Sequence, residues 1–204
     1  MRGISDILDE LNGSLNGERT SLAHILDIFH ERGFGAILFI LALPAALPVP
    51  AVGYGTILAI PLIFLTAQQA LGARALWLPR RLKQKTIASA ALKTTIAKAQ
   101  PFIAWLEIVI RPRLGSITQG VFSNIIGLAG LIMALSVLIP LPLTNTVPSL
   151  GIALMALGVL MRDGLAVLAG MVIGLAWIAL LGYFILTFGA EGIEMMKDMV
   201  KSIL

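Results

Sequence analysis

Three long apolar blocks, separated by short polar segments, dominate the pattern of the chain. They run from Gly33 to Gly72, from about Gly115 to Met161 and from Gly164 to Gly189. A helix needs about 20 apolar residues to cross a hydrocarbon core of about 30 Å. The last block therefore predicts one membrane helix, and each of the first two is long enough for two. The pattern predicts an all-α, polytopic membrane protein, with residues 1–204 in a single integral membrane domain. We expect it to be built from two similar units with proline-broken helices or re-entrant hairpins.

The polar ends of the chain have the spacing of amphipathic helices. Residues 1–32 predict two such helices, and Thr20 or Ser21 can cap the second. The apolar faces are Ile4, Ile7, Leu8, Leu11 and Leu15 in the first helix and Leu22, Ile25, Leu26 and Phe29 in the second. The other segments are predicted as a first unit at 33–72, a basic cytoplasmic loop and connecting helix at 73–115, a second unit at 116–163, a last membrane helix at 164–189 and an amphipathic tail at 190–204.

A shift of 92 residues aligns part of the first unit with part of the second. Residues 34–50, FGAILFILALPAALPVP, and residues 126–142, IGLAGLIMALSVLIPLP, are identical at six of 17 positions. The informative identities are Gly35 with Gly127, Pro48 with Pro140 and Pro50 with Pro142. These aligned glycines and Pro-x-Pro elements predict that the unit is duplicated.

Each Pro-x-Pro element is predicted to break a membrane helix, because proline removes a backbone donor and clashes with the preceding turn. Broken backbone survives in a membrane only inside protein or beside a water-filled cavity. Two broken helices at matching places indicate a midplane binding site, and the free N–H groups of the helices that follow favour an anion. A tight surface turn between two complete helices is the alternative interpretation of each element, and it stays open.

The candidate binding residues lie at these breaks and at the polar ends of the blocks. Small and hydroxyl residues after each break would let backbone approach a ligand or would cap the new helix. The glutamines could line a polar path, and the arginines beside Pro112 could hold a phosphate. The Arg-Asp pair that ends the second unit either provides a counter-ion or proton carrier or simply ends a helix at the interface. The full set is Pro48, Pro50, Gly53, Tyr54, Thr56, Gln68, Gln69, Arg111, Arg113, Pro140, Pro142, Thr144, Asn145, Thr146, Ser149, Arg162 and Asp163.

Charge is distributed unevenly in a chain that is 58% hydrophobic and 13% charged. Residues 1–32 contain three Arg and six acids, a balance of −3, whereas residues 74–113 contain nine Lys or Arg and one acid, a balance of +8. The positive-inside rule places the basic segment in the cytoplasm. A site for anionic lipid or nucleic acid is the other interpretation, but topology alone explains the charge. We therefore expect membrane lipids, and no nucleic acid, as partners.

The residue types present disfavour several classes of chemistry. The chain has no cysteine, which excludes disulfides and thiolate chemistry, and its two histidines, His24 and His30, lie in the N-terminal segment. Glu107, Asp163 and Glu191 are the only acids between residues 33 and 191. These are too few for most metal-dependent or acid–base catalysis, so we expect no enzyme activity, no metal and no cofactor.

Five short motifs, ALPAALPVP, WLPRRL, RPRL, PLPLTNTVPS and RDG, follow one another in this order. The ordered set, which spans about Thr20 to Gly182, resembles the exopolysaccharide-synthesis ExoD family of bacterial inner-membrane proteins. The segment LGARALWLP departs from the family, which more often has a run of arginines where this chain has only Arg74. The resemblance implies a multi-pass inner-membrane protein linked to exopolysaccharide production, and it implies no particular reaction.

Two functions remain as hypotheses. The first is a small transporter or channel, working as a homo-oligomer, that binds an ion, a small anion or a lipid-linked phosphate at the two broken helices. The second is a non-catalytic accessory or scaffold protein that docks polysaccharide-synthesis proteins through its amphipathic ends and basic loop. If residues 86–110 cross the membrane the two units are inverted, and if they lie flat the units are parallel.

Overall fold

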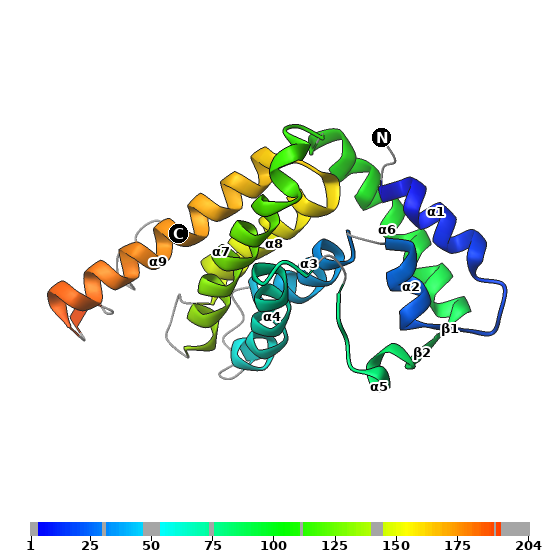
Figure 1. The fold of residues 1–204 in the computed structure, drawn as a ribbon, viewed down its shortest axis with the longest axis horizontal. Helices are drawn as coiled ribbons and strands as arrows, with labels where there is room; N and C mark the ends of the chain where they lie inside the picture. The colour runs from blue at the N-terminus through cyan, green and yellow to red at the C-terminus, as the bar shows by residue number, and fades with distance from the viewer. Residues whose placement is uncertain are drawn as a thin grey trace.

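The structure is a computed structural model, and it describes residues 4–29, 32–46, 54–73, 76–110, 112–139, 145–189 and 191–192. Figure 1 shows these residues in two parts, which we call the apolar bundle and the polar head. The apolar bundle consists of α3 (Gly33–Ala46), α4 (Tyr54–Ala70), α7 (Val121–Leu138), α8 (Thr146–Met161) and α9 (Gly164–Phe188).

None of the five bundle helices contains Asp, Glu, Lys or Arg. Both α7 and α9 are long and apolar enough to cross a membrane, whereas α3, α8 and the part of α4 from Ile57 to Ala70 are shorter apolar helices. The predicted all-α class is thus found, and α9 coincides with the helix expected at 164–189.

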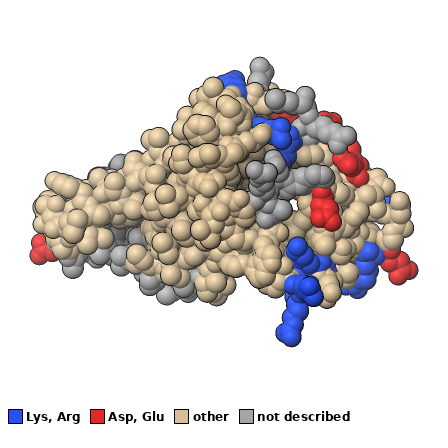
Figure 2. Space-filling view, in the orientation of Figure 1, with Lys and Arg blue, Asp and Glu red and all other residues tan. Residues whose placement is uncertain are grey.

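The polar head consists of α1 (Ile4–Ser14), α2 (Leu22–Phe29), α5 (Arg80–Lys83) and α6 (Ser89–Val109), with an antiparallel pair of strands, β1 (Arg19–Ser21) and β2 (Thr86–Ala88). Glu107 of α6 accepts hydrogen bonds from the N–H groups of Ile4 (2.6 Å) and Ser5 (3.0 Å) and from the Ser5 hydroxyl (2.7 Å). A carboxylate stabilises a helix start because the first N–H groups lack partners there and the helix dipole is positive. Figure 2 shows that charged side chains gather over the polar head, while the visible bundle surface is almost free of them.

The predicted N-terminal helices agree with the structure. Ile4, Ile7, Leu8, Leu11 and Leu15 are all buried. The Ser21 hydroxyl caps α2 by accepting the N–H of His24 at 3.2 Å. The sequence does not predict the two strands, because three residues are too few for an alternating pattern to be visible.

Burial of α8 connects the bundle to the head. From Gly151 to Met161 every residue of α8 except Leu154 is buried. Ile152, Met155 and Val159 belong to the core of the bundle. Leu157, Leu160 and Met161 instead pack into a second core with α1 and α6, so α8 is enclosed from both parts.

The helices α3 and α4 form one hairpin, and α7 and α8 form a second, which packs against the first. Here α3 lies along α8, and α4 lies along α7. A Cβ at Gly35 would lie 2.7 Å from the carbonyl oxygen of Ala156, and a Cβ at Gly127 would collide with the backbone of Gln69 and Ala70. Small residues are what allow helix backbones to approach this closely in apolar bundles.

The helix ends follow the 92-residue shift that aligns these two glycines. Leu138, the last residue of α7, lies 92 residues after Ala46, the last residue of α3. Thr146 begins α8 and lies 92 residues after Tyr54, which begins α4. The duplication stays a prediction. The helix ends, and the packing of each hairpin's first helix against the second helix of the other hairpin, are those that a duplicated unit would have.

Substitution of Gly127 tests the close approach of the two hairpins. We expect Gly127→Ala to lower the free energy of unfolding by about 1–3 kcal/mol, because the added methyl group forces α7 away from α4. Thermal unfolding of the purified protein in detergent, followed by circular dichroism, would show a lower midpoint temperature. Gly182→Ala in α9 is the matched control, since a Cβ there would have nothing within 4 Å. Equal midpoints for the two variants would contradict the packing described.

Candidate functional site

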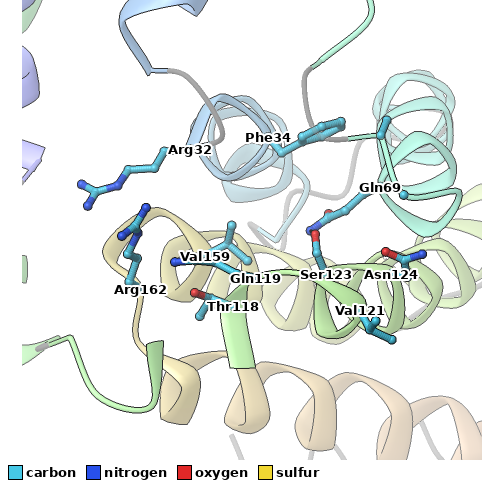
Figure 3. Close-up of a pocket in the computed structure, with 13 residues that line it drawn as sticks. Arg32, Phe34, Gln69, Thr118, Gln119, Val121, Ser123, Asn124, Val159 and Arg162 are labelled. Atoms are coloured by element: carbon cyan, nitrogen blue, oxygen red, sulfur yellow. The ribbon is translucent and has the colours of Figure 1, made fainter. Parts of the chain in front are cut away.

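A cavity of about 430 Å³ opens where the bundle helices begin and end (Figure 3). Its walls come from the start of α3, the end of α4, the start of α7 with the 3₁₀ turn η2 (Gly115–Thr118) before it, and the end of α8. The described lining residues are Arg32, Phe34, Gln69, Gly72, Ala73, Thr118, Gln119, Gly120, Val121, Ser123, Asn124, Val159 and Arg162. The volume is in the range of small-molecule sites.

The helix ends that line the cavity also show in which direction the two hairpins run through the bundle. Both α3 and α7 begin at the cavity, and both α4 and α8 end there. Each hairpin therefore leaves this end of the bundle and returns to it. The segment whose orientation the sequence leaves open, α6, packs against α1 in the polar head instead of running beside the hairpins. The two hairpins consequently run in the same direction in this structure, and their origin as a repeated unit stays a prediction.

A tight turn between α8 and α9 presents Arg162 to the cavity. Arg162 ends α8 in the left-handed conformation (φ 56°), and Asp163 starts α9 as its N-cap. The Asp163 carboxylate accepts the N–H of Leu165 at 2.9 Å and that of Ala166 at 3.4 Å. Next to it, the Gly164 N–H donates to the carbonyl oxygen of Arg113 at 2.6 Å. These bonds satisfy N–H groups that an α-helix start leaves free, so the structure gives Asp163 a capping role.

Two guanidinium groups lie on one side of the cavity. Arg32 directly precedes α3, Arg162 ends α8, and Figure 3 shows both side chains at the left of the view. Burial, followed by the charge of Arg162, lowers the pKa of Arg32 below its ordinary value, while Glu107 raises it. Burial and the neighbouring guanidinium group therefore both disfavour the charged form of Arg32, and Glu107 partly offsets them. No Asp or Glu is among the described residues that line the cavity.

Neutral polar groups form the other side of the cavity. Gln69 is 2% exposed, and its Nε2 donates to the Ser123 hydroxyl at 3.3 Å. Asn124 lies beside the turn that ends α4, where a Cβ at Gly72 would be 3.2 Å from the Asn124 amide nitrogen. Gln119 lies between η2 and α7 and is exposed. In Figure 3 Gln69, Ser123 and Asn124 lie at the right, away from the two arginines.

Two of the predicted binding residues, Gln69 and Arg162, line this cavity. Gln68 instead accepts the backbone N–H of Trp77 at 2.9 Å through its Oε1, and its Nε2 is buried with no hydrogen-bond partner. Arg113 is exposed and meets the start of α9 through its carbonyl oxygen. The structure thus brings only part of the predicted set together.

The predicted site at the helix breaks can be compared with the structure only in part. Asn145 occupies the N-cap position of α8, but in a helical conformation and with no side-chain capping bond. Thr146 begins α8, and Ser149 in its first turn is fully buried with a hydroxyl that has no hydrogen-bond partner. Tyr54 and Thr56 begin α4, but their side chains lie outside the described residues. The whole of Pro48, Pro50, Gly53, Arg111, Pro140, Pro142 and Thr144 also lies outside them.

Sequence reasoning missed most of the cavity. In the sequence pattern, Arg32 contributes only to the charge of the N-terminal segment, and residues 118–124 belong to the start of an apolar block. A usable signal exists there, because Thr118, Gln119, Ser123 and Asn124 are four polar residues at the boundary of that block.

The chemistry of the cavity suits an anion. Arginine binds phosphate and carboxylate oxygens through paired N–H groups, and amides and hydroxyls add neutral hydrogen bonds. In the described part of the chain, no group of three His, Asp or Glu residues could hold a metal ion. Fold and site together define a helical protein with two possible membrane helices and a cationic cavity at one end of an uncharged bundle.

The chain belongs to the ExoD family. The family profile described as "Exopolysaccharide synthesis, ExoD" matches residues 4–183, which confirms the resemblance seen in the motifs. The chain is 36% identical over 191 residues to the uncharacterized protein slr1875 of Synechocystis sp., covering 91% of this chain and 89% of that relative. It is 32% identical over 189 residues to Protein ExoD of Rhizobium meliloti, covering 89% of this chain and 78% of that relative. No solved structure matches it.

Proposed function

We propose that the protein is a small membrane transporter or channel that serves exopolysaccharide production and binds an anionic substrate in the cavity between its hairpins. The observation that supports this is the pair Arg32 and Arg162, placed in a cavity at the end of five helices with no charged residue. The family description supplies the link to exopolysaccharide synthesis. The substrate is an ion, a small anion or a lipid-linked phosphate.

Exposed apolar surface supports a membrane location. Only 39% of the apolar window of α7 and 33% of that of α9 is buried inside the molecule. Val172 and Leu186, both in α9, are 64% and 89% exposed. Soluble monomers rarely expose extensive apolar patches, whereas lipid or a second copy of the chain would cover them. We place the protein in the bacterial inner membrane as a multi-pass homo-oligomer, with the basic α5 region on the cytoplasmic side.

Parallel hairpins are compatible with transport. Transporter repeats occur in inverted form and also in parallel form, related by an axis along the membrane normal. Gln69 lines the cavity and also a small void of about 10 Å³ between the hairpins, which Thr66 and Gly35 line as well. An anion moving further into the bundle would have to displace this buried side chain. Gln69 is therefore the proposed barrier of the path.

The polar head favours a second function, that of a non-catalytic accessory protein of the polysaccharide-synthesis machinery. Trp77 is 59% exposed, and Arg80 and Arg81 of the neighbouring α5 are exposed as well. Tryptophan and arginine are enriched in protein interfaces. Under this alternative, substitutions at these positions reduce exopolysaccharide output and substitutions in the cavity do not.

Release of radiolabelled phosphate from proteoliposomes tests the transport function. We expect the protein to release phosphate faster than protein-free liposomes do, and Arg162→Ala to reduce the protein-dependent rate about tenfold or more, because a hydrogen-bonded charge contributes roughly 1.5–3 kcal/mol to binding. Arg80→Ala removes the same charge from α5 and should keep the full rate. No protein-dependent release, in a preparation that still binds phosphate, would reject transport and leave the accessory function.

Labelling of single cysteines tests the membrane location and the sides of the two bundle ends. The chain has no cysteine of its own, and Ser116 in η2 and Thr187 near the end of α9 are both exposed. The test uses cells whose outer membrane has been removed and whose inner membrane is intact. We expect a membrane-impermeant maleimide to label Thr187→Cys in these cells. We expect it to label Ser116→Cys only after the inner membrane is opened. Equal labelling of both before opening would contradict a crossing by α9.

A further inference from the structure

We propose that the cavity takes a sugar phosphate, with the phosphate between Arg32 and Arg162 and the sugar hydroxyls against the side that contains Ser123 and Asn124. This rests on the proposed anion site and names the class of compound that fits it. The inference comes from the division of the cavity into a cationic side and a neutral polar side (Figure 3).

The cationic side matches a phosphate better than a carboxylate. A carboxylate offers two oxygens and one negative charge, which a single arginine can bind in the paired geometry. A phosphate monoester has three terminal oxygens and about −1.5 to −2 charges at neutral pH. Two guanidinium groups from different helices, Arg32 before α3 and Arg162 at the end of α8, therefore suit a phosphate held between them.

The cavity leaves room for more than a phosphate. Its volume of about 430 Å³ is many times the roughly 30 Å³ that one water molecule occupies in the liquid. An inorganic phosphate at the arginines would leave the part beside Asn124 and Gln69 to solvent. A ligand that fills the cavity must join its anionic group to a neutral group of comparable or larger size.

The chemistry of the neutral side matches sugar hydroxyls. Each hydroxyl both donates and accepts hydrogen bonds, and the amides of Gln69 and Asn124 also present donors and acceptors. The Ser123 hydroxyl accepts from Gln69 at 3.3 Å, which fixes these two groups in place at the back of the cavity. A purely apolar tail would leave such polar groups without partners at a cost, so the neutral part of the ligand is hydroxylated.

Titration calorimetry with the purified full chain in detergent tests this division. The ligands are inorganic phosphate, glucose 1-phosphate and glucose. We expect glucose 1-phosphate to bind at least several-fold more tightly than phosphate, and glucose alone to bind weakly. Arg32→Gln and Arg162→Gln should each weaken both phosphates by the same factor, about tenfold or more. Asn124→Ala should weaken glucose 1-phosphate about two- to tenfold and leave inorganic phosphate unchanged. Arg80→Gln is the control for a lost surface charge.

The outcomes separate this inference from the proposed function. If phosphate and glucose 1-phosphate bind equally and Asn124→Ala affects neither, the sugar assignment is wrong while the anion site stands. If neither phosphate binds, or the Arg32 and Arg162 variants bind as the parent does, the anion site is wrong as well. If all variants melt at comparable temperatures, a variant that gives no heat of binding has lost the binding site and not its fold.

The same headgroup could arrive as a free sugar phosphate or on a lipid. An alkyl phosphodiester of glucose, added to the same titration, distinguishes the two sources. Binding of the diester at least as tight as that of glucose 1-phosphate assigns the site to a lipid-linked sugar. Binding of the monoester alone assigns it to a soluble sugar phosphate, because the diester lacks the third terminal oxygen.

Discussion

Backbone contact between two helical hairpins, at Gly35 and Gly127, is the constraint on which the rest of the structure depends. A side chain at either position would meet the backbone of the opposite hairpin, so the pairing of α3 with α8 and of α4 with α7 requires glycine there. This pairing encloses α8, which then contributes to the core of the bundle and to that of the polar head. It also brings four helix ends together, and the cavity forms among those ends.

In the described part of the chain, the five bundle helices contain no charged residue, and two acids outside them have specific roles. The acid in α6, Glu107, binds the start of α1, and Asp163 binds the start of α9. Glu107 also raises the pKa of Arg32, so it acts on the cavity as well as on α1. The described cavity lining contributes Arg32 and Arg162 and no acid, and such an arrangement favours anions over cations.

Local periodicity allows much of the fold, and less of the site, to be predicted from the sequence. Leu8 and Leu11 could be assigned to a buried face because helical spacing is a local property, and Gly127 could be singled out because it aligns with Gly35. The cavity joins Arg32 to Arg162 and Gln119 to Gln69, pairs far apart in the chain, and no local pattern encodes such contacts. The proline elements lie outside the described residues, whereas the two arginines of the cavity lie where the hairpins begin and end.

The central claim is that an accessible, cationic cavity lies where the two hairpins begin. Its most direct test is the rate at which a cysteine at position 119 reacts with thiosulfonate reagents of similar size and opposite charge. The chain has no cysteine of its own, so each variant reacts at one site. The ratio of the anionic to the cationic reaction rate should be several-fold higher for Gln119→Cys than for Ser116→Cys, which lies outside the cavity. Phosphate should slow the reaction of Gln119→Cys with the anionic reagent. Faster reaction with the cationic reagent, or no effect of phosphate, would contradict the account.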